Sequence, residues 1–221
     1  ETEIGERSDS RSPGNLEQFI EKHGGPLTVI PKLCRKAGMD FFPSFRMNQH
    51  YDSDITDKLR LEHPEYLINR GKEPSKGSME WGIGRGLDFS FEEVRKVKAD
   101  VILETVERFD VDGVELDFMR HPGYFKVEQA ISNAYLITDM VKYIRTGMDK
   151  LGKANNKNYD LIVRVPASFS ASLGIGLDVE TWIEKDLVDI VVAGGGFIPF
   201  DGPIREFVEK ETSEKSQILI I

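Results

Sequence analysis

Two acidic side chains stand two residues apart in the run Asp-Val-Asp-Gly-Val-Glu-Leu-Asp, residues 110–117. The pattern is typical of a tight turn followed by a short buried strand. Because successive side chains of a strand point to opposite faces, Glu115 and Asp117 share one face. An unpaired buried carboxylate costs several kcal/mol, so each must pair with a cation or lie at an open strand end. Arg120 and His121 follow directly, which favours an open strand end where chemistry takes place.

Basic and amide side chains also lie at the end of one other predicted strand and inside another. Arg46 and Asn48 follow one of them, and Arg164 lies inside another. An arginine within a strand is tolerated when a carboxylate lies beside it. Glu115 is one layer deeper than Asp117, so we expect Glu115 to anchor Arg164 or Arg46. That arginine would in turn hold Asp117 ionised.

The connection over residues 47–90 is long for a compact domain and indicates a functional excursion, with a short helix near residues 55–69. Its aromatic side chains Tyr51, Tyr66 and Trp81 suit stacking on sugar rings. The alternative is that Trp81 and Tyr66 only hold the loop on the core.

The composition excludes several classes of protein. The 221 residues are 39% hydrophobic and 30% charged, which indicates one globular domain with a sizeable core. A net charge of −9 without a basic stripe argues against nucleic acid as a partner. The single cysteine, Cys34, excludes a disulfide framework and is expected in the core. No apolar run approaches the ~20 residues of a membrane span, and no signal peptide opens the chain. We expect the natural N-terminus to lie upstream of Glu1, which leaves the compartment open.

Helix and strand patterns alternate along the chain. We expect a polar loop over residues 1–14 and one barrel-type domain over residues 15–221. The helices are predicted at residues 16–23, 27–37, 90–109 (opened by a capping box at 90–93), 130–151, 179–185 and 203–211, and the strands at 40–45, around 114–118, and at 159–166, 187–193 and 217–221.

Apolar strands alternating with helices indicate parallel pairing in an α/β fold. An open doubly wound sheet lacks support, because Gly82, Gly84 and Gly86 lie in a loop rather than at the start of a helix. Polar residues instead collect at the C-terminal ends of several strands, as in barrel enzymes. Five strands are visible, whereas a closed barrel has eight and typically ~250 residues. The sequence therefore predicts an incomplete portion of a (β/α)8 TIM barrel.

Five segments carry a family resemblance: residues 42–48 (Phe-Pro-Ser-Phe-Arg-Met-Asn), 111–122 (Val-Asp-Gly-Val-Glu-Leu-Asp-Phe-Met-Arg-His-Pro), 164–166 (Arg-Val-Pro), 176–182 (Gly-Leu-Asp-Val-Glu-Thr-Trp) and 192–196 (Val-Ala-Gly-Gly-Gly). They resemble the glycosyl-hydrolase-like TIM-barrel family, distantly related to α-amylase-type barrels, over most of residues 15–202. The resemblance implies a glycoside hydrolase that acts on an oligo- or polysaccharide without a cofactor, in a secreted or periplasmic setting. It also implies that Asp117 is the catalytic carboxylate of the fourth barrel strand. The next strand ends in Val-Pro-Ala-Ser and offers no acid, so the second carboxylate stays open.

The two central carboxylates have different expected roles. Glycosidic cleavage uses two carboxyl groups ~5 Å apart for retention or ~6.5–9.5 Å apart for inversion. Glu115 and Asp117 are about 7 Å apart along the strand and differ in depth. We therefore assign catalysis first to Asp117, keep Glu115 as the other acidic candidate, and favour an anchoring role for Glu115. The expected substrate-binding residues are Arg46, Asn48, Arg120, His121, Arg164, Trp81 and Tyr51.

Three other functions remain open. A metal-dependent hydrolase would use His50, Asp52, Asp117 and His121, although no His-x-His or His-Glu-x-x-His motif supports it. A phosphate-binding barrel would use the amides of the glycines at 194–196, which no lysine accompanies. A barrel that binds carbohydrate without cleaving it would keep the aromatic residues and need no second carboxylate.

Overall fold

The strand order of the sheet decides between the two architectures. The computed structural model describes residues 15–48, 58–69, 78–119, 122–194, 205–209 and 217–220. Within them, neighbouring strands are parallel and follow the sequence in the order β1 (Ser44–Arg46), β2 (Gly113–Asp117), β3 (Asp160–Val165), β4 (Ile190–Ala193) and β5 (Gln217–Ile220). A sheet in which spatial order follows chain order has no switch point, so it is barrel-like and not doubly wound. The prediction of a portion of a (β/α) barrel is confirmed.

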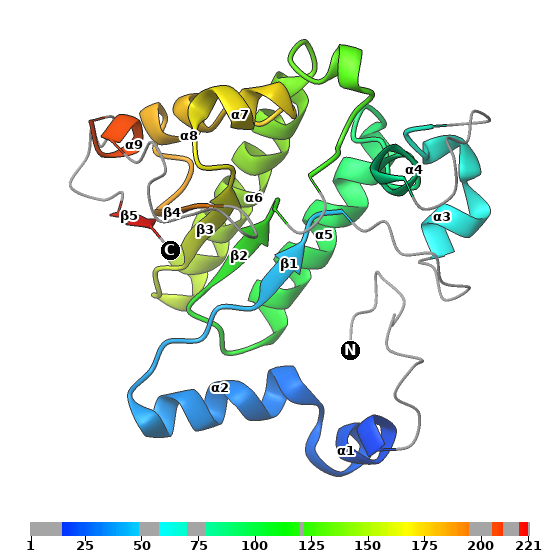
Figure 1. Ribbon diagram of the computed structural model, residues 1–221. Helices are drawn as coiled ribbons and strands as arrows, with labels where there is room; N and C mark the ends of the chain where they lie inside the picture. The colour runs from blue at the N-terminus through cyan, green and yellow to red at the C-terminus, as the bar shows by residue number, and fades with distance from the viewer. Residues whose placement is uncertain are drawn as a thin grey trace.

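Helices connect the strands. α5 and α6 lie side by side along the sheet, and α7, α8 and α9 follow toward the other edge (Figure 1). None of the helices in the described ranges is long and apolar enough to cross a membrane. The helical elements are α1 (Asn15–His23), α2 (Pro26–Ala37), α3 (Lys58–Glu62), the 3₁₀ turn η1 (Pro64–Tyr66), α4 (Met79–Gly84), α5 (Glu92–Arg108), the 3₁₀ turn η2 (Val127–Gln129), α6 (Ala134–Asn155), α7 (Phe169–Gly174), α8 (Val179–Glu184) and α9 (Arg205–Glu209).

The two faces of the sheet differ in polarity because the side chains alternate along each strand. The face toward the helices carries the fully buried apolar residues Val114, Leu116, Val163, Val165 and Val191. These pack with the inner faces of α5 and α6 into one hydrophobic core. The opposite face carries the charged side chains of β1, β2 and β3, which are only partly buried or exposed. The predicted alternation around Glu115 and Asp117 is therefore confirmed.

An ion network closes the N-terminal end of β2. Arg35 of α2 contacts Asp112 at 2.7 Å and Asp110 at 3.1 Å, and Lys157 contacts Asp110 at 3.2 Å. Burial alone would raise the pKa of Asp112, but the hydrogen bonds from Arg35 and from the Phe41 amide, with the charge of Lys157, hold it below its usual value. The first two acids of the central run thus belong to the closed end of the sheet, away from the strand ends expected to carry chemistry.

Several predicted boundaries are wrong. The helix expected from residue 90 begins at Glu92, with Phe91 at its N-cap and no side-chain cap, so the predicted capping box is absent. The amide of Ser90 instead donates to the carboxylate of Asp88 at 2.9 Å. The sequence pattern does not predict α4 or α7, because each is a single short helix inside a segment rich in Gly or Ser. Cys34 is half-buried on α2 and is not a core residue.

Candidate functional site

Charged side chains line the C-terminal ends of the first three strands. Arg46, Asp117 and Arg164 are paired in register across β1, β2 and β3. Residues paired in register point to the same face, so these three form a row at one level. Ser44 and Glu115 form a second row two residues deeper in the same sheet face. The structure thus brings together four of the nine predicted site residues: Arg46, Glu115, Asp117 and Arg164.

Glu115 is anchored by Arg164. Arg164 Nε donates to Glu115 Oε1 at 3.0 Å, and Arg164 Nη2 donates to Oε2 at 3.1 Å. Ser44 Oγ adds a third hydrogen bond to Oε1 at 2.9 Å. The hydrogen bonds to Glu115 raise the pKa of Arg164 above its already high value. The predicted anchoring is confirmed, and with both oxygens engaged Glu115 fits this role better than catalysis.

Asp117 is held at the strand end by backbone groups on both sides. Its Oδ1 accepts a hydrogen bond from the amide of Met119 at 2.9 Å, and its carbonyl accepts one from Met47 at 3.0 Å. The following amide, that of Phe118, donates to the Arg164 carbonyl at 3.0 Å. After the larger contribution from Glu115, the charge of Asp117 also raises the pKa of Arg164. The Asp117 carboxylate is therefore oriented, partly exposed and close to a guanidinium.

Asn48 lies near this site but faces the protein interior. Its side chain is 2% exposed, and Nδ2 donates to the carbonyls of Leu87 at 2.9 Å and Gly123 at 2.6 Å. Oδ1 accepts from the Leu87 amide at 3.0 Å. β1 ends at Arg46, so Asn48 lies beyond the strand and need not share a face with Arg46. Asn48 ties three chain segments together, and this geometry supports a structural role rather than substrate contact.

Two of the three aromatic residues predicted to stack on sugar, Trp81 and Tyr66, lie within the described residues, and their surroundings differ. Trp81 on α4 is partly exposed, and the guanidinium of Arg85 lies 4.9 Å from its ring centroid. Tyr66 stacks on His63 with centroids 4.7 Å apart and packs against Phe91 at 4.8 Å. Tyr66 therefore fits the alternative role of holding the loop on the core, whereas Trp81 stays a stacking candidate.

Packing places α4 beside the segment that follows β2. A Cβ built on Gly123 would come within 2.6 Å of Ile83 Cγ2, so the helix and this segment are in direct contact. Trp81 lies on the same short helix as Ile83. Trp81 thus belongs to a helix that contacts the segment after β2 at Gly123.

The remaining predicted residues cannot be placed. Tyr51, Arg120 and His121 lie outside the described residues, as do His50 and Asp52 of the metal alternative, so these stay predictions. Across the described ranges, no group of three or more His, Cys, Asp or Glu side chains could hold a metal ion. Gly194 donates its amide to the Val165 carbonyl at 3.0 Å, so this amide is already used in the sheet and is not aimed at an anion.

The sequence analysis assigns no site role to two residues near Asp117, Ser44 and Tyr124. The alternation of residues along β1 places Ser44 beside Arg46 and is the signal that could have found it. Tyr124 is fully buried and hydrogen-bonded to the backbone after Asp117, and no local pattern in the sequence marks it.

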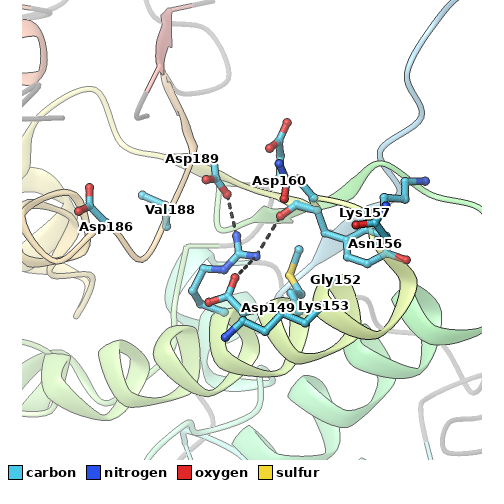
Figure 2. Close-up of a pocket in the computed structure, with 13 residues that line it drawn as sticks. Asp149, Gly152, Lys153, Asn156, Lys157, Asp160, Asp186, Val188 and Asp189 are labelled. Carbon is cyan, nitrogen blue, oxygen red and sulfur yellow. Dashed lines mark hydrogen bonds and ion pairs between the residues drawn. The ribbon is translucent and has the colours of Figure 1, made fainter. Parts of the chain in front are cut away.

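A pocket of about 770 Å³ lies at the opposite end of the sheet, around the end of α6 and the starts of β3 and β4 (Figure 2). Arg145 crosses it, contacting Asp189 and Asp149 at 2.7 Å each and donating to the Tyr159 carbonyl at 3.0 Å. Burial and the charge of Asp189 raise the pKa of Asp160 at its edge. Because barrel enzymes use the C-terminal ends of their strands, we place the candidate site at Asp117 and regard this ion network as structural.

Comparisons with known proteins give distant structural neighbours. No protein-family model matches the chain, and no curated protein matches its sequence. The chain is similar to a glycoside hydrolase family 18 N-acetylglucosaminidase from Paenibacillus barengoltzii (19% identity, TM-score 0.45, 60% of this chain and 45% of that one). It is also similar to a family GH18 chitinase from Chromobacterium violaceum (14%, 0.47, 76% and 24%) and to a chitinase from Bacillus thuringiensis (18%, 0.40, 60% and 25%).

These neighbours are glycoside hydrolases, and the chain spans less than half the length of each. At such low identity and TM-score, the likeness carries no argument about residues or substrate. The expected relationship to α-amylase-type barrels stays a prediction.

Proposed function

We propose that the chain forms the active-site end of a glycoside hydrolase of (β/α) barrel type, acting on an oligo- or polysaccharide, with Asp117 as its essential carboxylate. The observation that carries the proposal is the row of Arg46, Asp117 and Arg164 at the C-terminal strand ends. A single oriented carboxylate between two guanidinium-bearing strands suits a nucleophile or general base.

The proton donor comes from another element. Glycosidic cleavage needs a second carboxyl group, and Glu115 is engaged by Arg164. Among the strand ends that the structure describes, β1 ends in Arg46, β3 in Val165 and β4 in Ala193, so Asp117 is the only acid at this level. We therefore infer that an element other than these strand ends supplies the second carboxyl group. The proposed acid–base mechanism needs no cofactor.

Substitution of Asp117 by Asn tests the proposal, because the change removes the charge and keeps the shape. Hydrolysis of a panel of aryl glycosides and labelled oligosaccharides should fall at least ~100-fold, the low end for loss of a positioned acid or base. Folding should survive, since an amide oxygen can still accept the Met119 hydrogen bond. An undiminished rate would show that Asp117 is not the essential carboxylate.

Asp160→Asn is the matched control. Asp160 begins β3, at the end of the sheet away from Asp117. Burial raises its pKa, so removal of its charge should not destabilise the fold at neutral pH. We expect the rate of this variant to equal that of the wild type. Activity in the presence of EDTA tests the metal alternative, and we expect it to be retained.

A second candidate is a barrel that binds carbohydrate without cleaving it. The observation that favours it is the lone acid at the described strand ends. Glycan binding by the wild-type protein with no turnover on any probe would select this candidate. In that case Asp117→Asn should change the Kd for the glycan rather than a rate.

A further inference from the structure

We propose that Tyr124 is a positioning residue that fixes the Asp117 carboxylate by clamping the peptide that follows it. The Tyr124 hydroxyl donates to the Phe118 carbonyl at 2.6 Å, and the side chain is only 1% exposed. Phe118 comes directly after Asp117, where β2 has ended. This inference rests on the proposed function of Asp117.

Tyr124 is itself held rigidly. Its ring packs edge-on against Phe89 and Phe118, with centroids 5.3 and 5.4 Å away. Its carbonyl accepts a hydrogen bond from the Phe89 amide at 2.8 Å. The preceding carbonyl, that of Gly123, accepts from Asn48 at 2.6 Å. The clamp is therefore fixed to the segments after β1 and before α5, and cannot move independently of them.

The clamped peptide controls the direction of the catalytic side chain. The Phe118 amide donates to Arg164, and the Phe118 carbonyl accepts from Tyr124, so this residue is restrained at both ends. The next amide, that of Met119, is the one that orients Asp117 Oδ1 at 2.9 Å. Rotation of the Phe118 carbonyl would turn the Met119 amide away from the carboxylate, because the two share one planar peptide unit.

The Tyr124 hydroxyl keeps its proton over the pH range in which catalytic carboxyl groups titrate. Burial, and then the charge of Asp117, raise the pKa of Tyr124 well above its usual value. The hydroxyl is therefore a permanent donor, and the clamp does not titrate together with the catalytic groups.

Tyr124→Phe removes the hydroxyl and preserves the ring, so it tests the clamp with little change in packing. We expect kcat on the best aryl glycoside to fall about 10- to 100-fold, as for a small misplacement of a reacting group. KM should stay within about twofold, because ground-state contacts are unchanged. Amide hydrogen exchange at Met119 should become at least about tenfold faster, measured under conditions where global unfolding does not contribute.

Tyr159→Phe is the matched control. Tyr159 is also buried, and its hydroxyl accepts one hydrogen bond, from Asn155 at 3.0 Å, near the opposite end of β3. This variant loses the same group, but we expect its kcat and its exchange at Met119 to equal the wild-type values. Urea unfolding of both variants separates a general loss of stability from a local effect at Asp117.

The exchange measurement keeps this inference separate from the proposed function. If the wild-type protein cleaves none of the probes, the proposed function fails, and exchange at Met119 alone decides whether Tyr124 holds this peptide. Met119 exchange in Tyr124→Phe that is no faster than in Tyr159→Phe would overturn the clamp whatever the kinetics. Faster exchange confined to Tyr124→Phe, with the fall in kcat, supports it.

Discussion

Replacement of Arg164 by Met removes the cation that neutralises Glu115 and keeps an unbranched side chain in the strand. In the wild type the pair is bidentate, with N–O distances of 3.0 and 3.1 Å. Of the three hydrogen bonds to Glu115 described above, the variant keeps only the one from Ser44. We expect a clear loss of stability, because a largely buried carboxylate would keep its charge without a cation beside it.

The burial of Glu115 and Arg164 sets the size of the expected loss of stability. Loss of one partner of a fully buried pair costs about 3–5 kcal/mol, whereas an exposed pair is worth at most about 1 kcal/mol. The Glu115 side chain is 15% exposed and that of Arg164 is 34% exposed, which places the pair between these limits. We therefore expect Arg164→Met to lower the free energy of unfolding by about 2 kcal/mol.

Urea unfolding at neutral pH measures this loss, and a double-mutant cycle assigns it to the pair. The double variant Glu115→Leu, Arg164→Met has no charge left to compensate, so it should recover much of the lost stability. A loss below about 0.5 kcal/mol for Arg164→Met, within the range of ordinary surface substitutions, would refute the reasoning. So would a loss in the double variant equal to the sum of the losses in Arg164→Met and Glu115→Leu, since the two charges would then act independently.

Two further predictions concern the long connection and the closed end of the sheet. Trp81→Ala should weaken glycan binding by about 1 kcal/mol in titration calorimetry with little change in Tm, whereas Tyr66→Ala should lower Tm and leave the Kd unchanged, because Tyr66 packs on Phe91. Asp112→Asn should destabilise the protein at neutral pH. The folded-state pKa of Asp112 is lowered, so its contribution is present above about pH 4 and is lost as the pH falls through the folded value. In urea unfolding, the stability difference between this variant and the wild type should therefore shrink in acid, and a difference independent of pH would contradict the assignment.

The sequence predicts the fold well because the pattern of apolar and polar residues in a strand reflects what covers each of its faces. Each strand of a parallel sheet covered by helices must be apolar on the covered face, and this alternation is visible around Glu115 and Asp117. The polar residues that interrupt it mark the uncovered face. The positions and parallel pairing of all five predicted strands could therefore be read locally, and only their ends are shifted by a few residues.

Local patterns fail where other groups compete for the same polar atoms. The capping box expected at residues 90–93 does not form, because Asp88 takes the amide of Ser90. Asn48 was expected to face substrate, but the carbonyl and amide of Leu87 and the carbonyl of Gly123 satisfy its side chain. These partners are 39 and 75 residues away in the sequence, so no window around Asn48 contains the information.

The roles of the two central carboxylates follow from strand register, which local sequence does not contain. Arg164 is paired in register with Asp117, yet its guanidinium reaches back to Glu115, two residues deeper. Glutamate has one methylene more than aspartate, so Glu115 can present both oxygens to the planar fork of the arginine. Asp117, which is shorter, instead accepts the Met119 amide and stays at the strand end. A two-residue step along one strand thus separates an anchoring carboxylate from the one that we propose to react.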